Sequence, residues 1–204
     1  MPVLATDNFN RANADPISGS WTDLGDANHF IIDTNTAIPS ATNDDAAAFY
    51  NAVTWPNDQY SQVKVTVTGG GGGGSGIGPL VRGREPGAGR DYYRLVIDHA
   101  GTSNVELAKR VNGAYTQLWL RTQAFTNGDT LYLEIQGTTL IAKLNGTAIG
   151  ASQTDTAVTT GNAGIVYSSL GTAPSMDDWE GGDFAAAADD GPMFATRNAI
   201  QLVG

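Results

Sequence analysis

The chain has 204 residues with a formal net charge of −10 at pH 7, and 41% of its residues are hydrophobic. This length suits one large β domain with a sizeable core, and no apolar run approaches the ~20 residues of a membrane-spanning helix. The negative charge opposes binding to nucleic acid, because phosphate contacts need clustered Lys and Arg. The absence of cysteine excludes disulfides and thiolate metal sites. The first residues lack the basic start and apolar core of a secretory signal, so we expect synthesis without export.

The composition favours turns and strands over helices. The acidic residues are 17 Asp against 4 Glu, with 26 Gly and only 3 Lys. Asp and Gly are typical of turns, whereas Glu and Lys are typical of helices. The sequence therefore predicts an all-β domain.

The N-terminal third predicts short strands. We expect strands over residues 6–12, with Phe9 buried, over Phe30–Ile32, and over Ala46–Val53. Tyr60–Thr68 alternates, which predicts one buried face that includes Val63, Val65 and Val67. The six glycines Gly69–Gly74 then suggest a phosphate loop, but no Lys-Ser or Lys-Thr pair closes the run, and a strand rather than a helix is expected next. A strand connector explains them better.

The clearest pattern runs from Asp91 to Gly150. Alternation of apolar and polar residues predicts one hairpin from Asp91–Asp98 and Asn104–Val111, and a second from Asp129–Gln136 and residues 140–145. Each ends at an Asn-Gly pair, which suits the positive φ angles of a tight hairpin turn. Alternation with a period of two residues over about sixty residues predicts an antiparallel sheet with one buried face.

The C-terminal part predicts two more strands and then a tail. Gly161–Ser168 and Met176–Glu180 are the expected strands, and the second would close the domain. We expect a domain over residues 1–184, followed by a linker and tail over residues 185–204.

Several short motifs resemble the concanavalin A-like lectin and glucanase sandwiches, in particular laminin-G-like domains of bacterial and bacteriophage proteins. They are Asp7-Asn8-Phe9-Asn10-Arg11-Ala12, Gly78-Pro79-Leu80-Val81-Arg82, Tyr92-Tyr93-Arg94-Leu95, Leu131-Tyr132-Leu133-Glu134-Ile135, Leu144-Asn145-Gly146, Gly161-Asn162-Ala163-Gly164-Ile165 and Asp177-Asp178-Trp179. The resemblance implies a two-sheet antiparallel jelly roll whose first and last strands lie side by side. It implies little about activity, because this fold serves enzymes, lectins and structural modules.

The sequence offers no catalytic set. Polysaccharide-cutting members of the resembled superfamily carry alternating carboxylates on one strand, which serve as nucleophile and acid/base. Glu85, Glu106, Glu134 and Glu180 are scattered singly. The two histidines, His29 and His99, are too few for a catalytic zinc site and suit polar turns. We expect no enzyme activity, with a glucanase as the remote alternative.

Two kinds of ligand site are expected. Trp55 and Tyr115 are the candidates for sugar stacking, because Trp55 stands beside Pro56 and Tyr115 falls in an expected turn over Asn112–Thr116, whereas Trp21 and Trp179 suit the core. The resemblance implies a structural calcium ion between the first and last strands. Asp7, Asp26, Asp177 and Asp178 are its candidate ligands, since calcium prefers several oxygen ligands. The alternative is that these aspartates keep an edge strand soluble.

The expected function is a non-enzymatic structural or binding module. The resemblance and the lack of an export signal favour a bacteriophage virion component, a capsid decoration or tail-associated protein, assembled in the host cytoplasm. Its expected partners are other virion proteins, a second copy of itself, or a cell-surface glycan. The alternative is a carbohydrate-binding module of a secreted, extracellular bacterial protein.

The tail is the candidate assembly segment. Its apolar residues would favour aggregation if left in water, so we expect them to be buried. They would either pack on the domain itself or insert into a neighbouring subunit. The residues concerned are Met193, Phe194, Ile200 and Leu202.

Overall fold

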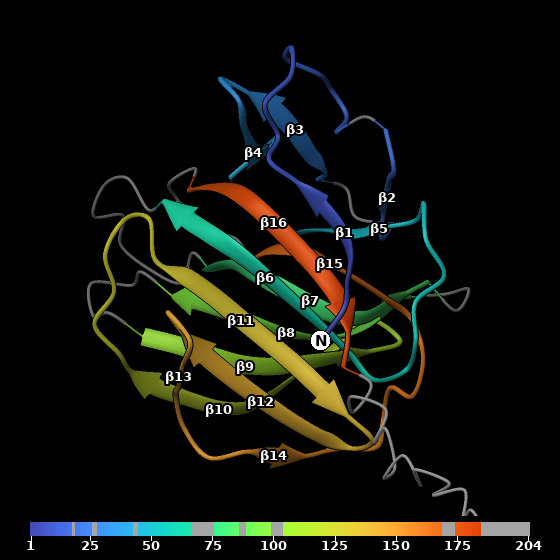
Figure 1. Cartoon of the computed structure of the whole chain (residues 1–204), viewed down its shortest axis with the longest axis vertical. Coiled ribbons are helices and arrows are strands. Elements are labelled where there is room, and N and C mark those ends of the chain that lie inside the picture. Colours follow the sequence, from blue (N-terminus) through green and yellow to red (C-terminus); the bar gives the residue numbers. More distant parts are fainter. Residues whose placement is uncertain are drawn as a thin grey trace, which may run out of the picture.

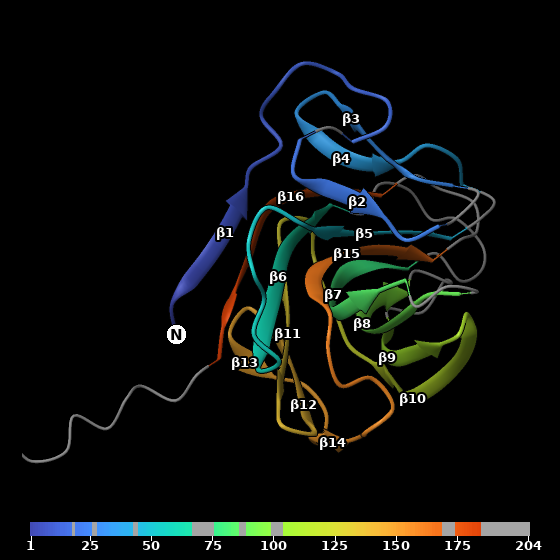
Figure 2. The same ribbon diagram turned by 90° about the vertical axis from the view of Figure 1, so that its right-hand side faces the viewer.

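The computed structural model forms a sandwich of two antiparallel β sheets (Figures 1 and 2). It describes residues 1–17, 19–25, 28–42, 45–66, 76–85, 89–98, 104–168 and 174–184. Within these ranges every regular element is a strand, which confirms the expected all-β jelly roll. The same ranges contain no helix that is long and apolar enough to cross a membrane.

The nine-stranded sheet faces the viewer in Figure 1. Its main path runs in the order β13-β12-β11-β6-β16-β4-β3, with β1 paired to β16 and β14 paired to β12. The bounds are β1 Val3–Asp7, β3 Phe30–Asp33, β4 Thr36–Pro39, β6 Gln59–Thr66, β11 Thr130–Gln136, β12 Thr139–Leu144, β13 Thr147–Ala148, β14 Gln153–Thr154 and β16 Ser175–Asp183.

The seven-stranded sheet lies behind it and is seen on the other side of the sandwich in Figure 2. Its strands follow the order β10-β9-β8-β7-β15-β5-β2. The bounds are β2 Trp21–Asp23, β5 Ala46–Tyr50, β7 Gly76–Arg84, β8 Asp91–Asp98, β9 Asn104–Val111, β10 Ala114–Thr122 and β15 Asn162–Ser168.

The core lies between the sheets and follows from the period of two. On β11, Leu131, Leu133 and Ile135 are fully buried, and on β8, Tyr93, Leu95 and Ile97 are fully buried. Because successive strand residues point to opposite faces, the residues between these point outward. The predicted β11–β12 hairpin is present, with Leu131 opposite Leu144 and Ile135 opposite Leu140.

The two Asn-Gly pairs adopt positive φ as expected, but each begins a further hairpin instead of closing the predicted one. Asn112 and Gly113 have φ of 50° and 79° and connect β9 to β10. Strand β10 is a correction, because residues 112–116 were interpreted as a turn. The strand was missed because its side chains are largely exposed along an edge of the sheet, so its pattern lacks a buried face.

The first and last strands lie side by side, as the resemblance implied. Ala5 pairs with Gly181 and Asp7 with Trp179, and the amide of Asp183 donates to the carbonyl of Pro2 at 3.0 Å. The first strand spans Val3–Asp7, not residues 6–12 as predicted. Phe9 is buried as expected, but it has a φ of 52° and follows the strand, where the Asp7 carboxylate accepts its amide hydrogen.

Candidate ligand-binding site

The outer face of the seven-stranded sheet buries side chains that would normally be solvated. Tyr92 and Val96 on β8 point to this face, since their neighbours Tyr93, Leu95 and Ile97 point into the core. They join a second apolar cluster with Leu80 of β7, and all three side chains are at most 2% exposed. Arg94 lies between them in sequence and is only 4% exposed.

Arg94 is held by a carboxylate on the neighbouring strand. Its Nη2 atom donates to Oε1 of Glu106 on β9 at 2.8 Å, and Glu106 is itself buried. The hydroxyl of Tyr115 on β10 donates to Oε2 of the same carboxylate at 2.7 Å. The guanidinium carbon of Arg94 lies 5.2 Å from the centre of the Tyr115 ring, a distance that suits a cation–π contact.

Two more arginines surround this pair. Arg110 on β9 and Arg90 before β8 both contact the carboxylate of Asp45, the latter at 3.6 Å between Nη2 and Oδ2. Burial lowers the pKa of Arg90, and the charges of Arg110 and Arg94 lower it further. The three guanidinium groups are therefore close enough to repel one another. We call Arg90, Arg94 and Arg110, together with Tyr92, Tyr115, Asp45 and Glu106, the arginine hollow.

The arginine hollow contains buried donors without partners. Nε and Nη1 of Arg94, Nε of Arg110 and the hydroxyl of Tyr92 are buried and make no hydrogen bond within the described structure. An unpaired buried polar group costs about 1–3 kcal/mol. Burial opposes the charge of Arg94, yet its pKa is raised, because Tyr92, Glu106 and Asp45 favour the charged form. Buried polar atoms without partners call for an explanation such as a bound water, ion or ligand, so Arg94 is a candidate ligand-binding residue.

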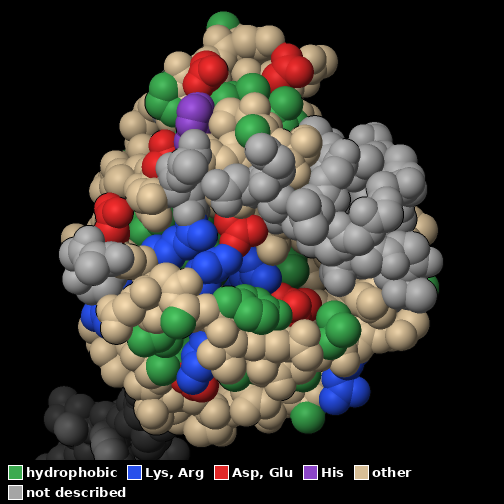
Figure 3. Space-filling model, turned by 180° about the vertical axis from the view of Figure 1, so that it is seen from behind, with side chains coloured by type: hydrophobic (Ala, Val, Ile, Leu, Met, Phe, Trp, Pro, Cys, Tyr) green, Lys and Arg blue, Asp and Glu red, His purple; other side chains and the backbone are tan. Residues whose placement is uncertain are grey.

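The space-filling view of this side shows the same arrangement. In Figure 3, Lys and Arg side chains gather in a hollow in the middle of the face, with acidic and hydrophobic side chains beside them. Arg94 forms a buried part of this site, whereas Tyr115 is 45% exposed. The site therefore combines an accessible aromatic ring with buried cationic donors.

Tyr115 is exposed as predicted, and Trp55 is not. Tyr115 is exposed as expected, although it lies within β10 and not in a turn. Trp55 is only 9% exposed, which corrects the expectation of an exposed ring. Its indole nitrogen donates to the carbonyl of Tyr50 at 2.7 Å and its ring lies 6.1 Å from that of Trp179, so Trp55 belongs to the core with Trp21 and Trp179.

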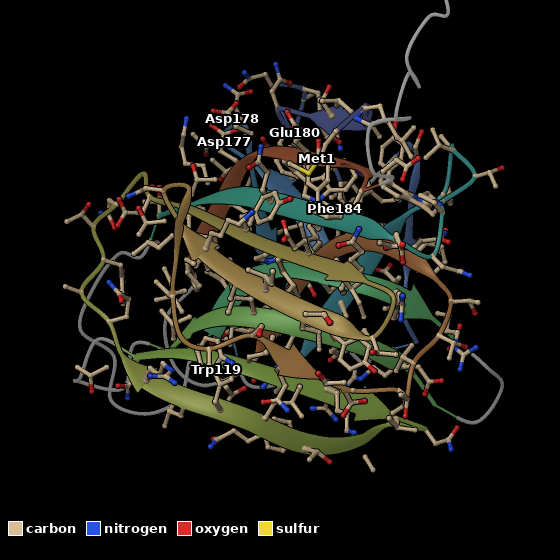
Figure 4. All side chains as sticks on the ribbon, turned by 60° about the horizontal axis from the view of Figure 1, so that its bottom comes forward. Met1, Trp119, Asp177, Asp178, Glu180 and Phe184 are labelled. Atoms are coloured by element: carbon tan, nitrogen blue, oxygen red, sulfur yellow. The ribbon has the colours of Figure 1, made fainter. Side chains whose placement is uncertain are left out.

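A second hollow of about 550 Å³ lies on the outer face of the nine-stranded sheet. Asp7, Lys64, Asp178 and Glu180 are among its lining residues. Figure 4 shows Asp177, Asp178, Glu180 and Met1 along this side of the molecule, with Trp119 on the opposite side. This is the region where the calcium ligands were expected.

The aspartates of this region are engaged with protein donors. Oδ1 of Asp7 accepts from the Phe9 amide and from Arg11, and its Oδ2 accepts from the indole of Trp21 at 2.8 Å. Asp178 pairs with Lys64. Burial raises the pKa of Asp177, and the charges of Asp178 and Asp7 raise it further. The described residues contain no group of three His, Cys, Asp or Glu side chains arranged to hold a metal.

The remaining predicted site residues lie outside the described residues. They are Asp26, Met193, Phe194, Ile200 and Leu202. The calcium ion and the assembly segment therefore stay predictions.

Three glutamates are occupied by polar partners. Glu106 is held by Arg94 and Tyr115. Glu134 pairs with Lys143 at 2.8 Å. Glu180 accepts from Tyr60 at 2.8 Å and from Gln62 at 3.0 Å. The first lies on the seven-stranded sheet and the other two on the nine-stranded sheet, so they do not form the alternating set expected of a glucanase.

The arginine hollow was not predicted from the sequence. Arg90, Arg94 and Arg110 are separated along the chain, and register alone brings them together, with Arg94 opposite Ala108 and Tyr92 opposite Arg110. One signal was present: Arg94 alternates with Tyr92 and Val96 on the face opposite to the predicted core. A cation between two large apolar residues on an outward face indicates a covered surface.

Comparisons with known proteins find the fold and no close relative. No family model matches the chain, and no curated protein matches its sequence. Among solved structures, the carbohydrate-binding module CBM66 from Bacillus subtilis aligns with a TM-score of 0.62 and 16% identity over 78% of this chain and 93% of that one. The Bacillus licheniformis β-glucanase aligns with a TM-score of 0.61 and 13% identity over 87% and 96% of the two chains.

The chain has the concanavalin A-like fold. This confirms the resemblance drawn from the sequence. The exoplasmic/lumenal domain of VIP36, in a Ca²⁺- and Man3GlcNAc-bound form, gives a third match, with a TM-score of 0.61 and 12% identity over 82% of this chain and 85% of that one. Because these identities are low, the matches establish the fold of this concanavalin A-like sandwich and not its activity.

Proposed function

We propose that this concanavalin A-like domain is a non-enzymatic glycan-binding module and that the arginine hollow is its binding site. The observation that carries the proposal is Arg94, a buried guanidinium with two unpartnered nitrogen atoms beside an exposed tyrosine. Sugar sites typically combine an aromatic face with a few well-placed polar groups. Tyr115 supplies the ring, and Arg94, Arg110 and Tyr92 supply hydrogen-bond donors.

Binding without catalysis is supported by the state of the carboxylates. A retaining glycosidase needs one carboxyl group as nucleophile and a second as acid/base about 5–5.5 Å away. In the arginine hollow, Glu106 is paired with Arg94 and Asp45 is paired with Arg110. Both carboxylates are engaged with arginine donors, so neither is placed as a free acid/base or nucleophile.

The position on a virion is a proposal that concerns which side of the sandwich is attached. Met1 and Phe184 both lie at the nine-stranded sheet, on the other side of the sandwich from the arginine hollow (Figures 2 and 4). A module attached through the nine-stranded sheet would present the arginine hollow outward. This geometry suits a bacteriophage capsid decoration or tail-associated protein, and equally the alternative of a module in a secreted protein. Mass spectrometry of purified particles tests the first.

A structural calcium ion at Asp177 is part of the proposal. The raised pKa of Asp177 reflects burial and the repulsion of Asp178 and Asp7, which a cation would relieve. The VIP36 domain is described in Ca²⁺-bound forms.

A glycan array tests the binding function. We expect the wild-type protein to bind a defined subset of glycans, and Tyr115→Ala to lose most of this signal. Val3→Ala is the matched control, because Val3 is 51% exposed but lies on the nine-stranded sheet. Equal binding by wild type and Tyr115→Ala would place the site elsewhere, and no binding by the wild type would overturn the function.

A further inference from the structure

We infer that the arginine hollow selects saccharides that carry an acidic group, a carboxylate or a sulfate. This inference rests on the proposed glycan-binding function and adds the chemical class of the ligand. It depends on which hydrogen-bonding atoms of the arginine hollow are already used and which are not.

The unused atoms are predominantly donors. Nε and Nη1 of Arg94 and Nε of Arg110 can only donate, and the Tyr92 hydroxyl can donate as well. The acceptors are already engaged: both oxygens of Glu106 accept, from Arg94 and from Tyr115, and Asp45 accepts from Arg110. A neutral sugar hydroxyl both donates and accepts, so it would find few acceptors here. A carboxylate or a sulfate only accepts and therefore complements the unused atoms.

The charges of the arginine hollow favour the same ligand. Arg110 and Arg94 each act on Arg90 as like charges. An anionic group between them would relieve this repulsion and form charge-assisted hydrogen bonds, which are stronger than neutral ones. The three arginines and two carboxylates of the arginine hollow give it a formal charge of +1, whereas the chain as a whole carries −10.

The arrangement also places the rest of the sugar. Tyr115 is 45% exposed and its ring centre lies 5.2 Å from the Arg94 guanidinium. A sugar ring that packs on the exposed part of Tyr115 would bring its acidic substituent within reach of Arg94. This position distinguishes an acidic saccharide from a free anion, which would not use the tyrosine ring.

Calorimetric titration with matched ligands tests the inference. The probes are oligogalacturonate with its methyl ester, sialyllactose with lactose, and a sulfated chondroitin oligosaccharide with its desulfated form. We expect at least one acidic ligand to bind at least tenfold more tightly than its own counterpart. A tenfold difference in affinity is about what one charge-assisted hydrogen bond contributes. The three pairs separate uronate, sialate and sulfate as the source of the charge.

The variants assign the preference to the arginine hollow. Arg94→Gln and Arg110→Gln should each reduce the acidic preference by about tenfold. Lys64→Gln, on the nine-stranded sheet, removes a cation that lies outside the arginine hollow and should change nothing. If Arg94→Gln does not fold, Arg110→Gln still tests whether the arginine hollow causes the acidic preference. The ligand pairs are measured on the wild-type protein and need no variant.

The outcomes separate the two proposals. Equal affinity for the acidic and the neutral member of the oligogalacturonate and sialyllactose pairs, with no preference for sulfate in the chondroitin pair, would overturn the inference and leave the glycan-binding function intact. Desulfated chondroitin keeps its uronate carboxylates, so that pair reports on the sulfate alone. If the protein binds none of the six ligands and no glycan on the array, both the inference and the glycan-binding function are overturned. Equal binding of galacturonate monomer and inorganic sulfate would also overturn it, since this would show a simple anion site.

Discussion

Arg94 and Glu106 form a buried ion pair between β8 and β9, with 2.8 Å between Nη2 and Oε1. The pair lies on the outward face of the seven-stranded sheet, where a sandwich usually meets water. Glu106 thus determines whether Arg94 can stay charged and buried, and the arginine hollow depends on this pair.

Removing the carboxylate should destabilise the fold strongly. Glu106→Gln leaves Arg94 buried without a counterion, and breaking one side of a buried pair costs about 3–5 kcal/mol. Glu180→Gln is the control, because Glu180 is a more exposed carboxylate that accepts from Tyr60 and Gln62. Urea unfolding measures both. A loss for Glu106→Gln no larger than that of the control would contradict the importance of the pair.

Asp155 should make stability depend on pH. Burial alone would raise its pKa, but donors from Lys109, the Ala157 amide and Tyr93 lower it below the ordinary value of 3.8. A lowered native pKa contributes stability above the unfolded pKa and loses it as pH falls through the native one. We expect Asp155→Asn to cost about 1–2 kcal/mol at pH 7, and this difference to shrink below about pH 4. Urea unfolding at several pH values measures it, and a constant difference down to pH 2 would exclude this linkage.

The fold was predictable where one face of a strand is buried. Leu131, Leu133 and Ile135 alternate, so β11 and its pairing with β12 followed from the sequence. Strand β10 lies at an edge of its sheet, and both its apolar and its polar side chains are largely exposed. An alternation of apolar and polar residues therefore could not reveal it.

The site was less predictable because it depends on register. Trp55 precedes Pro56, which suggests a turn at the surface, yet packing on Trp179 buries it. Arg94 and Glu106 are twelve residues apart, and only the β8–β9 pairing brings them together. Tyr115 was found because a polar aromatic beside Asn112-Gly113 suits the surface, which the structure confirms.

Removal of calcium should lower the melting temperature if the ion binds at Asp177. An ion bound only to the native state stabilises that state by mass action. The measurement is a thermal melt with and without excess chelator, followed by elemental analysis. An unchanged melt on protein shown to be metal-free would exclude a structural calcium ion.

Deletion of residues 192–204 should leave the sandwich folded and weaken its incorporation into particles or oligomers. The described strands close the fold by Asp183, so the core does not depend on the tail if the assembly hypothesis holds. Circular dichroism and particle incorporation measure the two effects. Unfolding would assign the tail to the core, and normal assembly would exclude an attachment role.

Chemical-shift mapping by NMR tests the central claim most directly. Titration with the tightest array ligand should shift the backbone amides of Tyr92–Val96, Glu106–Arg110 and Tyr115–Gln117, which belong to β8, β9 and β10. The amides of Lys64 and Glu180, on the nine-stranded sheet, should stay in place. The largest shifts at Lys64 and Glu180, with none at Arg94 and Tyr115, would contradict a glycan site in the arginine hollow.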